Sequence, residues 1–521
     1  MKHYRISEIK TNIDEEIAVL PALVSKKVRI DVADIKQWEI RKKSIDSRQK
    51  PDIKLVYTVD FWCDRKINSE KINNLSVIDE EAEKIIEPEM GTEELMGRPI
   101  VVGMGPCGIF AALTLAKRGY KPLVIDRGQA MDERIAAVDN FRKAHILNPN
   151  ANMLFGEGGA GTFSDGKLTT GIKDPHIREV LRTFVEAGAG DEIMYLAKPH
   201  IGTDVLREII VNLRNDIISH GGEVRFSTKL ESLNIKEGKL VSVKLSDSDE
   251  EVKTNALILA IGHSARDTFE LIYNNALNME QKNFSIGVRM EHPQTLIDEA
   301  QYGAEAVSKY REYLPPADYK LSYKASNGRG VYSFCMCPGG EVVVCSTKDG
   351  ELCVNGMSNR RRDSGTANSG ILCDVRREDY NNGNPDDVLA GVRFQEKYER
   401  LAFENGGGNF NPPTATMEKF LGKKSPQIDN SLPLFAAESI REAVPEFARK
   451  IKGFDSAKAV VKAVETRSSS PVRILRDESG ESNISGIYPA GEGAGYAGGI
   501  TSAACDGIKI ANHLIERFSN K

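Results

Sequence analysis

Residues 99–126, PIVVGMGPCGIFAALTLAKRGYKPLVID, decide the fold class, because they predict a strand, a glycine turn, a helix and a second strand in that order. Gly103 permits a tight turn, Gly105 lets the main chain approach a pyrophosphate at the helix N-terminus, and Gly108 allows close helix–strand packing. Asp126, at the tip of the second strand, is placed to hydrogen-bond a ribose diol. The stretch therefore predicts a dinucleotide-binding βαβ unit.

A second strand, acid and glycine-flanked helix start occurs far along the chain, in residues 486–501, GIYPAGEGAGYAGGIT. A domain that binds only a nicotinamide dinucleotide has no use for this element, whereas a flavin does. Glu492 is placed to hold a ribityl hydroxyl, and the positive helix N-terminus at Gly499 and Ile500 suits the flavin edge that becomes negative on reduction. The two elements together predict bound FAD.

At these residues the chain resembles the two-dinucleotide-binding-domain flavoproteins, the superfamily that includes glutathione reductase and the aromatic hydroxylases. The resemblance includes the Ala260-Ile261-Gly262 turn and Gly491-Glu492, where Glu replaces the more usual Asp. Three longer runs resemble more narrowly the bacterial FAD-dependent dehydrogenases of unassigned substrate: FGEGGAGTFSDGKL at 155–168, GHSARD at 262–267 and ETRSSSPVR at 465–473. With the small N-terminal domain, this similarity covers nearly the whole chain. It implies an FAD-dependent oxidoreductase and names no substrate.

The resemblance also implies that Arg127 and Arg134 lie near the FAD pyrophosphate or adenosine and that Leu230 touches the adenine. Independently, the small residues of 156–167 can bring backbone N–H groups and the Lys167 cation close to a planar ring. We expect this loop to cover the isoalloxazine, the alternative being a flexible surface loop. The predicted cofactor-binding residues are Gly103, Gly105, Pro106, Cys107, Gly108, Asp126, Arg127, Arg134, Gly158, Gly161, Thr162, Ser164, Lys167, Leu230, Ala260, Gly262, Gly491, Glu492, Gly499 and Ile500.

The candidates for substrate chemistry are Lys167, Arg289, His292 and Arg467, with Glu291 beside them. The two arginines favour an anionic substrate, unless both are paired inside the protein. A lone histidine such as His292 is more often structural than a proton donor. For His263 and Arg266, which follow a predicted strand end, ordering of the domain junction is the alternative role.

The expected fold class is α/β, with a discontinuous Rossmann-type FAD-binding domain at residues 98–274 and 456–521. An inserted α+β substrate or cap domain is expected at 275–455. A small N-terminal α/β domain is expected at 1–72, with a strand at 4–9, a helix at 16–27 and a hairpin at 37–63, followed by a linker at 73–97.

Composition and charge argue against some classes of protein function. The 521 residues carry a net charge of −5, which argues against a protein that mainly coats nucleic acid or an anionic membrane. We find no apolar run of about 20 residues and no signal-peptide pattern at the start, so we expect a cytoplasmic protein. The basic segment Arg41–Asp52, placed between the hairpin arms, faces RNA, a partner or water, and a solvated turn is favoured.

The eight cysteines form no CxxC pair, which indicates reduced thiols rather than disulfides. Five of them fall between Cys335 and Cys373, but their spacing matches no common zinc or iron–sulfur pattern, so we expect no metal. Cys335, Cys337 and Cys345 are expected on the arms of one β-hairpin that turns at residues 338–340.

The preferred mechanism is ping-pong hydride transfer, in which a donor reduces FAD and the reduced flavin passes two electrons to an acceptor. NAD(P)H is a reasonable donor that docks transiently, since only one complete dinucleotide fingerprint is present. The absence of a CxxxxC redox pair argues against disulfide reductase chemistry. Two alternatives stay open: RNA modification or binding through Arg41–Lys50, and a non-catalytic FAD-bound regulator. The sequence does not predict the oligomeric state.

Overall fold

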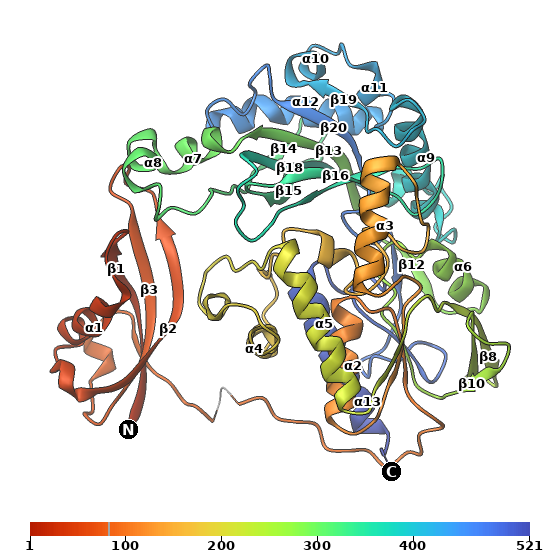
Figure 1. The fold of residues 1–521 in the computed structure, drawn as a ribbon, viewed down its shortest axis with the longest axis horizontal. Coiled ribbons are helices and arrows are strands. Elements are labelled where there is room, and N and C mark those ends of the chain that lie inside the picture. The colour runs from red at the N-terminus through yellow and green to blue at the C-terminus, as the bar shows by residue number, and fades with distance from the viewer. Residues whose placement is uncertain (82–83, 521) are drawn as a thin grey trace.

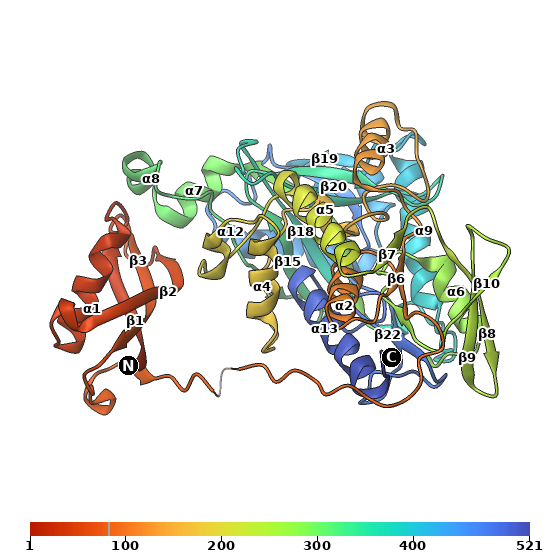
Figure 2. The same ribbon diagram turned by 60° about the horizontal axis from the view of Figure 1, so that its bottom comes forward.

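The computed structural model describes residues 1–81 and 84–520. Three parts follow one another along the chain (Figure 1): a small N-terminal sheet, a domain built on a parallel sheet, and a larger antiparallel sheet above it. The linker passes beneath the molecule toward the C-terminus (Figure 2), where Glu93 forms a β-bridge with Phe518. Among the described residues, no helix has the length and apolarity needed to cross a membrane.

The N-terminal domain is an antiparallel sheet in the order β2-β3-β1-β4. Its third strand shows why it folds, because Leu55, Tyr57, Val59 and Phe61 alternate along it and are all buried. The sheet ends at Val77, so the expected boundary at residue 72 moves into the segment predicted as linker. Its elements are β1 (Lys2–Asn12), α1 (Leu20–Val28), β2 (Ile35–Asp46), β3 (Lys54–Cys63) and β4 (Leu75–Val77).

The basic segment predicted between the hairpin arms is corrected by the structure, because residues 41–46 belong to β2 and only 47–53 form the turn. Strand β2 lies at the edge of its sheet and docks on the rest of the protein. The Lys43 main chain donates to Tyr195 O (2.7 Å) and accepts from Ala197 N (2.8 Å). The Lys50 ammonium donates to Ala300 O at 2.5 Å. The main-chain pairing of β2 joins the N-terminal domain to the parallel-sheet domain, and the Lys50 contact in the turn joins it to the antiparallel-sheet domain.

The second domain is built on a parallel sheet in the order β22-β11-β5-β6-β7, which confirms the predicted Rossmann-type α/β class. In β5, Ile100 and Val102 pack on one face and Val101 on the other, and all three are buried. Helices α2, α5 and α13 cover the face of Val101. The strands are β5 (Ile100–Val102), β6 (Leu123–Ile125), β7 (Glu223–Arg225), β11 (Leu257–Leu259) and β22 (Ile487–Pro489).

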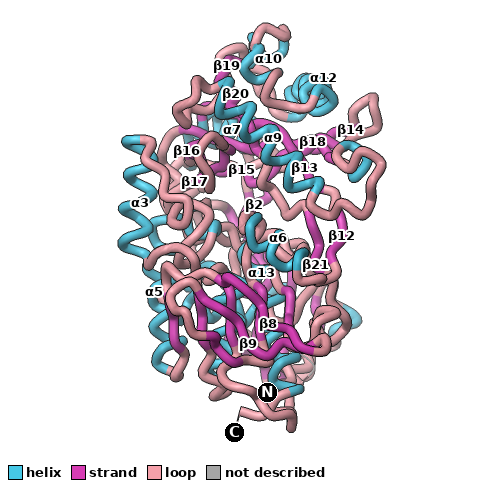
Figure 3. Tube along the Cα trace, turned by 90° about the vertical axis from the view of Figure 1, so that its right-hand side faces the viewer, coloured by secondary structure: helices cyan, strands magenta, loops and turns pink. Residues whose placement is uncertain are grey.

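An antiparallel meander covers the other face of the parallel sheet (Figure 3). Strand β7, which precedes the meander along the chain, pairs with β6 in the parallel sheet. The meander strands are β8 (Leu230–Lys236), β9 (Lys239–Leu245) and β10 (Glu251–Lys253). The helices of this domain are α2 (Pro106–Lys117), α3 (Met131–Ala144), α4 (Ile177–Glu186), α5 (Thr203–Ser219), α6 (Arg266–Asn274) and α13 (Ile500–Arg517).

The inserted domain, called the substrate domain after its expected role, is built on an antiparallel sheet of short and long strands. Their order is β14-β15-β18-β13-β20-β19. Strand β20 (Val460–Glu465) pairs with β13, so this sheet continues past the expected boundary at residue 455. The other strands of the sheet are β13 (Phe284–Pro293), β14 (Ser322–Lys324), β15 (Gly330–Cys337), β18 (Thr366–Val375) and β19 (Thr414–Thr416). Its helices are α7 (Gln294–Tyr302), α8 (Ala304–Tyr310), α9 (Ala390–Asn405), α10 (Met417–Leu421), α11 (Pro426–Asp429) and α12 (Leu434–Lys450).

The predicted cysteine hairpin is wrong. Strand β16 (Glu341–Cys345) pairs with β17 (Cys353–Met357), whereas β15 pairs with β14 and β18. The Pro-Gly-Gly turn therefore carries the chain from one sheet to another instead of closing a hairpin. A second two-stranded ladder, between β12 (Met279–Gln281) and β21 (Val472–Ile474), lies where the chain enters and leaves the substrate domain.

Candidate functional site

A cavity of about 710 Å³ lies between the carboxyl ends of the parallel strands and the substrate-domain sheet. The ends of β5, β6, β11 and β22 all reach it, as expected at this edge of an open α/β sheet. On the parallel-sheet side the lining includes Gly103, Gly105, Asp126, Gly262, Glu492 and Gly499. On the substrate-domain side it includes Tyr319, Tyr332, Cys335, Asn355, Glu465 and Arg467.

The three fingerprint glycines differ in what surrounds them. Gly103 has a φ of +102°, which glycine adopts at no steric cost. A Cβ at Gly108 would overlap the carbonyl oxygen of Gly103, so this glycine is required for packing of the helix against the turn. A Cβ at Gly105 would instead lie 3.8 Å from its nearest neighbour, Gly159 Cα. The space beside Gly105 therefore belongs to the cavity.

Asp126 fixes the shape of the glycine turn. Its Oδ2 accepts a hydrogen bond from Met104 N and its Oδ1 accepts one from Gly128 N, both at 2.8 Å. The carboxylate is buried but lines the cavity. Asp126 can therefore meet a ribose hydroxyl with its remaining lone pairs, while its main visible role is to order the main chain around it.

The loop of residues 156–167 is packed against the glycine turn. Fully buried Arg134 donates to the carbonyl oxygens of Asn152 (2.9 Å), Glu157 (2.6 Å) and Gly159 (2.9 Å). Gly158 N donates to Met104 O at 2.8 Å. These bonds contradict the alternative of a flexible surface loop. They also place the Arg134 guanidinium inside the loop rather than on the cavity wall, where the resemblance implied it.

The far end of the same loop is tied to the substrate domain. Asp165 pairs with Arg362, with an Oδ1–Nε distance of 2.9 Å, and it also accepts from the Ser358 hydroxyl. Lys167 lines the cavity, and its ammonium lies 4.0 Å from Asp165 Oδ2. Residue 161 meets helix α13, since a Cβ at Gly161 would lie 3.1 Å from Ile500 Cγ1. The loop thus connects the glycine turn, the α13 N-terminus and the substrate domain.

Glu492 faces the cavity at the end of β22, and its carboxylate has no hydrogen-bond or ion-pair partner among the described residues. Burial raises the pKa of Glu492 to about 7, an effect that the Lys282 ammonium offsets only in part. Beside it, the N-terminus of α13 opens on the cavity at Gly498 and Gly499, where an added Cβ would meet no atom within 4 Å. This end of the cavity offers an acceptor carboxylate and free helix N–H groups.

The structure divides the predicted cofactor residues into two groups. Those on the cavity wall are Gly103, Gly105, Pro106, Cys107, Asp126, Gly161, Ser164, Lys167, Ala260, Gly262, Glu492, Gly499 and Ile500. Those behind it are Gly108, Arg127, Arg134, Gly158, Thr162, Leu230 and Gly491. Arg127 stacks on the ring of Phe155 and pairs with Asp267 at 2.7 Å. Leu230 is buried in the core beneath the meander.

The predicted catalytic residues line the cavity less often than the predicted cofactor residues do. Arg289 is fully buried and pairs with Glu465 (Nε–Oε2, 2.7 Å), so the expectation that it meets substrate is corrected. His292 lies on the opposite face of β13, because side chains alternate along a strand. It stacks on Phe454 and bonds to Phe454 O at 2.7 Å, which removes it from the cavity. Glu291 pairs with Lys462 at 2.7 Å.

Arg467 lines the cavity, but its guanidinium is committed to Glu399 at 2.9 and 2.7 Å. Arg266 approaches the same carboxylate at 2.9 and 2.8 Å. Although burial by itself raises the pKa of Glu399, the two guanidinium groups hold that pKa well below its usual range. This cluster orders the domain junction, as the alternative reading of Arg266 expected, and it also includes Arg467.

Several cavity residues carry no sequence motif and were not predicted: Lys198, Tyr319, Lys320, Tyr332, Cys335 and Asn355. They come from loops and strands of unremarkable pattern, and only the packing of one domain on another brings them to the cavity. Strand β15 also has a β-bulge at Cys335, between its pairings at Phe334 and Cys337, and no glycine or proline within the bulge marks it in the sequence.

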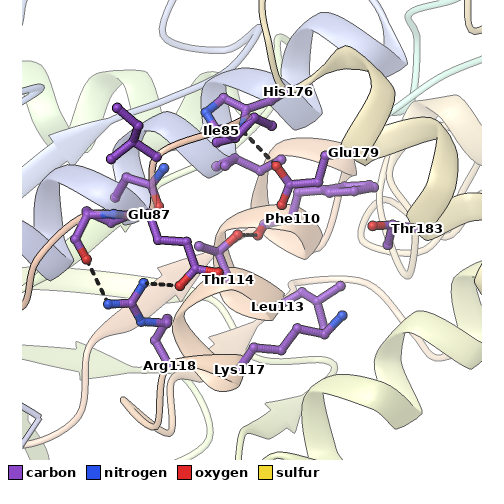
Figure 4. A pocket seen from close by; sticks show the side chains of 14 residues that line it. Ile85, Glu87, Phe110, Leu113, Thr114, Lys117, Arg118, His176, Glu179 and Thr183 are labelled. Carbon is purple, nitrogen blue, oxygen red and sulfur yellow. Dashed lines mark hydrogen bonds and ion pairs between the residues drawn. The ribbon is translucent and has the colours of Figure 1, made fainter. Parts of the chain in front are cut away.

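A second hollow, of about 150 Å³, lies on the outer side of α2 (Figure 4). Linker residues 85–88 cross it, and Glu87 pairs with Arg118 at 3.1 Å. His176 bonds to Glu179 at 2.7 Å on its far wall, and this bond raises the pKa of His176. None of the predicted site residues lies here, and the hollow is the place where the linker packs against α2.

Known proteins resemble this chain along most of its length. Residues 283–468 match the family model described as FAD-dependent protein, C-terminal domain-like, and residues 3–62 match a domain of unknown function. An uncharacterized protein of Clostridium beijerinckii is 45% identical over 534 residues, covering 99% of each chain. The chain belongs to this FAD-dependent protein family. The resemblance expected from the sequence is therefore confirmed, with the substrate unassigned.

Solved structures similar to this FAD-dependent protein share little sequence with it. A geranylgeranyl bacteriochlorophyll reductase-like protein from Thermoplasma acidophilum gives a TM-score of 0.35 at 14% identity, over 82% of this chain and 80% of that one. L-proline dehydrogenase from P. horikoshii gives 0.31 at 13% identity, over 81% and 91%.

The cavity of this FAD-dependent protein fits the cofactor that the family requires. Four glycines on its wall, Gly105, Gly262, Gly498 and Gly499, leave open space where a Cβ would stand. At one end, the N-terminus of α2, which begins at Pro106, would suit a diphosphate. At the other, the unpartnered Glu492 suits a ribityl hydroxyl. The wall therefore offers main-chain donors at one end and a carboxylate acceptor at the other.

Proposed function

We propose that the protein is an oxidoreductase that moves a hydride between a small organic substrate and FAD. One observation carries this proposal: the glycine turn, Glu492 and the α13 N-terminus line the same cavity as the substrate-domain residues Tyr319 and Cys335. A cofactor held at the first set is thus open to a molecule held at the second. FAD, when bound, supplies the reactive ring nitrogen that accepts or donates the hydride.

The residues of this chain supply binding, orientation and protection from water. When FAD is bound, the α2 N-terminus and Gly105 would hold the diphosphate, and Glu492 would accept from the ribityl chain. The loop 156–167, fixed by Arg134 and Asp165, closes the cavity between the domains. The Glu399 cluster with Arg266 and Arg467 holds the substrate domain on the parallel-sheet domain from the other side.

NAD(P)H is the electron donor that we favour. The described residues contain one glycine fingerprint on one parallel sheet, so a nicotinamide would enter the shared cavity transiently and leave before the substrate binds. This order of events is ping-pong kinetics.

The test is anaerobic mixing of the purified holoprotein with NADH, NADPH and a panel of small carboxylic and carbonyl metabolites, followed by flavin absorbance. Bleaching by one donor and recovery with one acceptor supports the proposal. Retention of oxidised FAD with every donor contradicts it and favours a non-catalytic flavin-bound regulator.

A further inference from the structure

Cys335 differs from the other seven cysteines, all of which are described. It alone is exposed, and it lines the cavity. Strand β15 pairs with β18 at Phe334↔Gly370 and again at Cys337↔Asn368, so two residues of β15 oppose one residue of β18. This bulge, with a φ of +41° at Cys335, breaks the alternation of the strand and re-aims the side chain. The thiol therefore faces the cavity instead of the sheet.

The bulge is held from behind by the buried guanidinium of Arg289. Its Nη1 donates to Cys335 O at 2.9 Å and to Asn368 Oδ1 at 3.0 Å. Its Nη2 donates to Asn355 Oδ1 at 3.0 Å and to Glu465 Oε1 at 2.9 Å. One of these four bonds holds the main chain at Cys335, and the other three anchor the guanidinium itself, so the position of the thiol is built into the fold.

Tyr319 supplies a second polar group on the same wall. The residue is 7% exposed and lines the cavity, and its hydroxyl makes no hydrogen bond of good geometry in the described part of the chain, although the Ser369 hydroxyl lies beside it. The neighbouring Ser369 hydroxyl donates to Gly370 O at 2.9 Å. Burial holds the pKa of Tyr319 above its usual range, so the phenol stays a donor at neutral pH. Buried hydroxyls without a partner are rare, and an acceptor on a ligand would satisfy this one.

Lys167 adds positive charge to these two groups. Its only ion-pair contact among the described residues is the 4.0 Å approach to Asp165, whose carboxylate is already bonded to Arg362 and Ser358. Cys335 and Lys167 line the same cavity; the protein that encloses this cavity raises the pKa of the Cys335 thiol to about 11, and the Lys167 ammonium acts against this rise. A cation and two protonated donors thus line one cavity, and the carboxylates of Asp165 and Glu465 on the same wall are each already paired with an arginine.

We propose that Lys167, Tyr319 and Cys335 form a subsite that binds an anionic oxygen of the substrate, such as a carboxylate oxygen. This inference deepens the proposed function and rests on it, since the subsite defines which substrates reach the cofactor. An ammonium and two neutral donors together complement a negatively charged acceptor better than a neutral one. The anionic substrate expected from Arg289 and Arg467 is thereby assigned to different residues.

The probe is benzoate, a planar carboxylate, added to the purified holoprotein. Its dissociation constant is measured from the change in flavin absorbance, and its occupancy from protection of Cys335 against N-ethylmaleimide, with the labelled residue identified by mass spectrometry. We expect Tyr319→Phe to weaken benzoate binding roughly tenfold and Lys167→Met by ten- to a hundredfold, as expected for loss of a neutral and of a charged hydrogen bond. Benzoate should slow labelling of Cys335 in the unsubstituted protein.

Two matched controls line the same cavity with groups that already have partners. Tyr332 donates its hydroxyl to Ser285 Oγ at 2.8 Å, and Lys198 pairs with Asp318 at 2.5 Å. Tyr332→Phe and Lys198→Met should therefore leave the benzoate constant within about twofold of the unsubstituted value, a limit corresponding to ~0.4 kcal/mol. Thermal melting of every variant excludes unfolding as the cause of a lost signal.

The subsite is overturned if benzoate neither perturbs the flavin nor protects Cys335, or if it binds equally well after Tyr319→Phe and Lys167→Met. It is also overturned if the two controls weaken binding as much as the subsite variants do. Each of these results leaves reduction of bound FAD by a donor unaffected. Failure of every donor to reduce the FAD would instead contradict the proposed function, so the two proposals fail separately.

Discussion

Asp126 accepts a 2.8 Å hydrogen bond from the main-chain N–H of Met104, inside the glycine turn. The carboxylate that ends β6 thereby fixes the turn that ends β5, and it caps Gly128 N with its other oxygen. The acid at the end of β6 and the glycines of the turn form one hydrogen-bonded unit. The predicted ribose contact is therefore added to a structural role that exists before any ligand binds.

Removal of the Asp126 carboxylate should damage both the fold and the cofactor site. We expect Asp126→Ala to lower the free energy of unfolding of the apoprotein by about 1.5–3 kcal/mol, because two buried N–H groups lose a charged acceptor. FAD affinity should fall as well, since the glycine turn is no longer held. Urea unfolding of the apoprotein and an FAD titration measure the two effects. An apoprotein as stable as the unsubstituted one would show that the two bonds contribute nothing.

Gly105 and Gly108 should respond in opposite ways to an added side chain. Gly105→Val places its side chain in open space, so the apoprotein should keep its stability within about 0.5 kcal/mol while FAD retention is lost. Gly108→Ala forces a Cβ onto the Gly103 carbonyl oxygen and should destabilise the apoprotein by about 1–3 kcal/mol. Thermal melting and flavin content after purification separate the pair. Stoichiometric FAD in Gly105→Val would move the diphosphate away from this turn.

Glu492 should make the stability of the apoprotein depend on pH. Burial raises the pKa of Glu492 from 4.5 to about 7, so between these values the folded state binds more protons than the unfolded state. Stability should therefore fall as pH rises through this window. Glu492→Gln removes the effect and should stabilise the apoprotein above pH 7 by at most about 3 kcal/mol, with no gain below pH 4.5. Unfolding free energies of both proteins across this range provide the check.

Glu492→Ala should weaken FAD binding by roughly ten- to a hundredfold, because a shielded carboxylate-to-hydroxyl bond contributes about 1.5–3 kcal/mol. Glu492→Asp should be milder, since the flavoproteins that the chain resembles commonly have Asp there. Flavin fluorescence gives the dissociation constant, and melting of apo and holo forms gives the stability. An unchanged constant would remove Glu492 from the site.

Glu399 should be essential for joining the domains. It is fully buried and pairs with both Arg266 and Arg467, so Glu399→Gln removes the carboxylate that the two guanidinium groups share and leaves Arg266 only its longer contacts with other carboxylates. We expect a loss of about 3–5 kcal/mol, the usual cost of breaking a buried ion pair by removing one partner. Glu396→Gln is the matched control, since that carboxylate is partly exposed and lies 3.9 Å from Arg266. Equal melting temperatures for the two variants would refute the role of Glu399.

Local patterns accounted for most of the parallel-sheet domain. The strand at 100–102, the helix that follows, Asp126 and the Glu492 turn were all found where their periodicity and glycines indicate. These features are local because a tight turn, a helix start and a strand end each depend on a few neighbouring residues. The same reasoning failed for the Pro-Gly-Gly turn after Cys337, because a turn sequence does not specify whether the strands on either side pair with each other.

The sequence by itself determined the Rossmann-type class, the cofactor family and the residues that shape the glycine turn. Only the tertiary structure decided that Arg289 pairs with Glu465 and that Arg467 pairs with Glu399. It also decided that His292 faces away from the cavity. Cys335 and Tyr319, in contrast, face into it. Charge pairing and cavity lining depend on which distant segments pack together. Glu399 lies 68 residues from Arg467, and a contact over that distance is selected by the burial of whole faces, which no local pattern records.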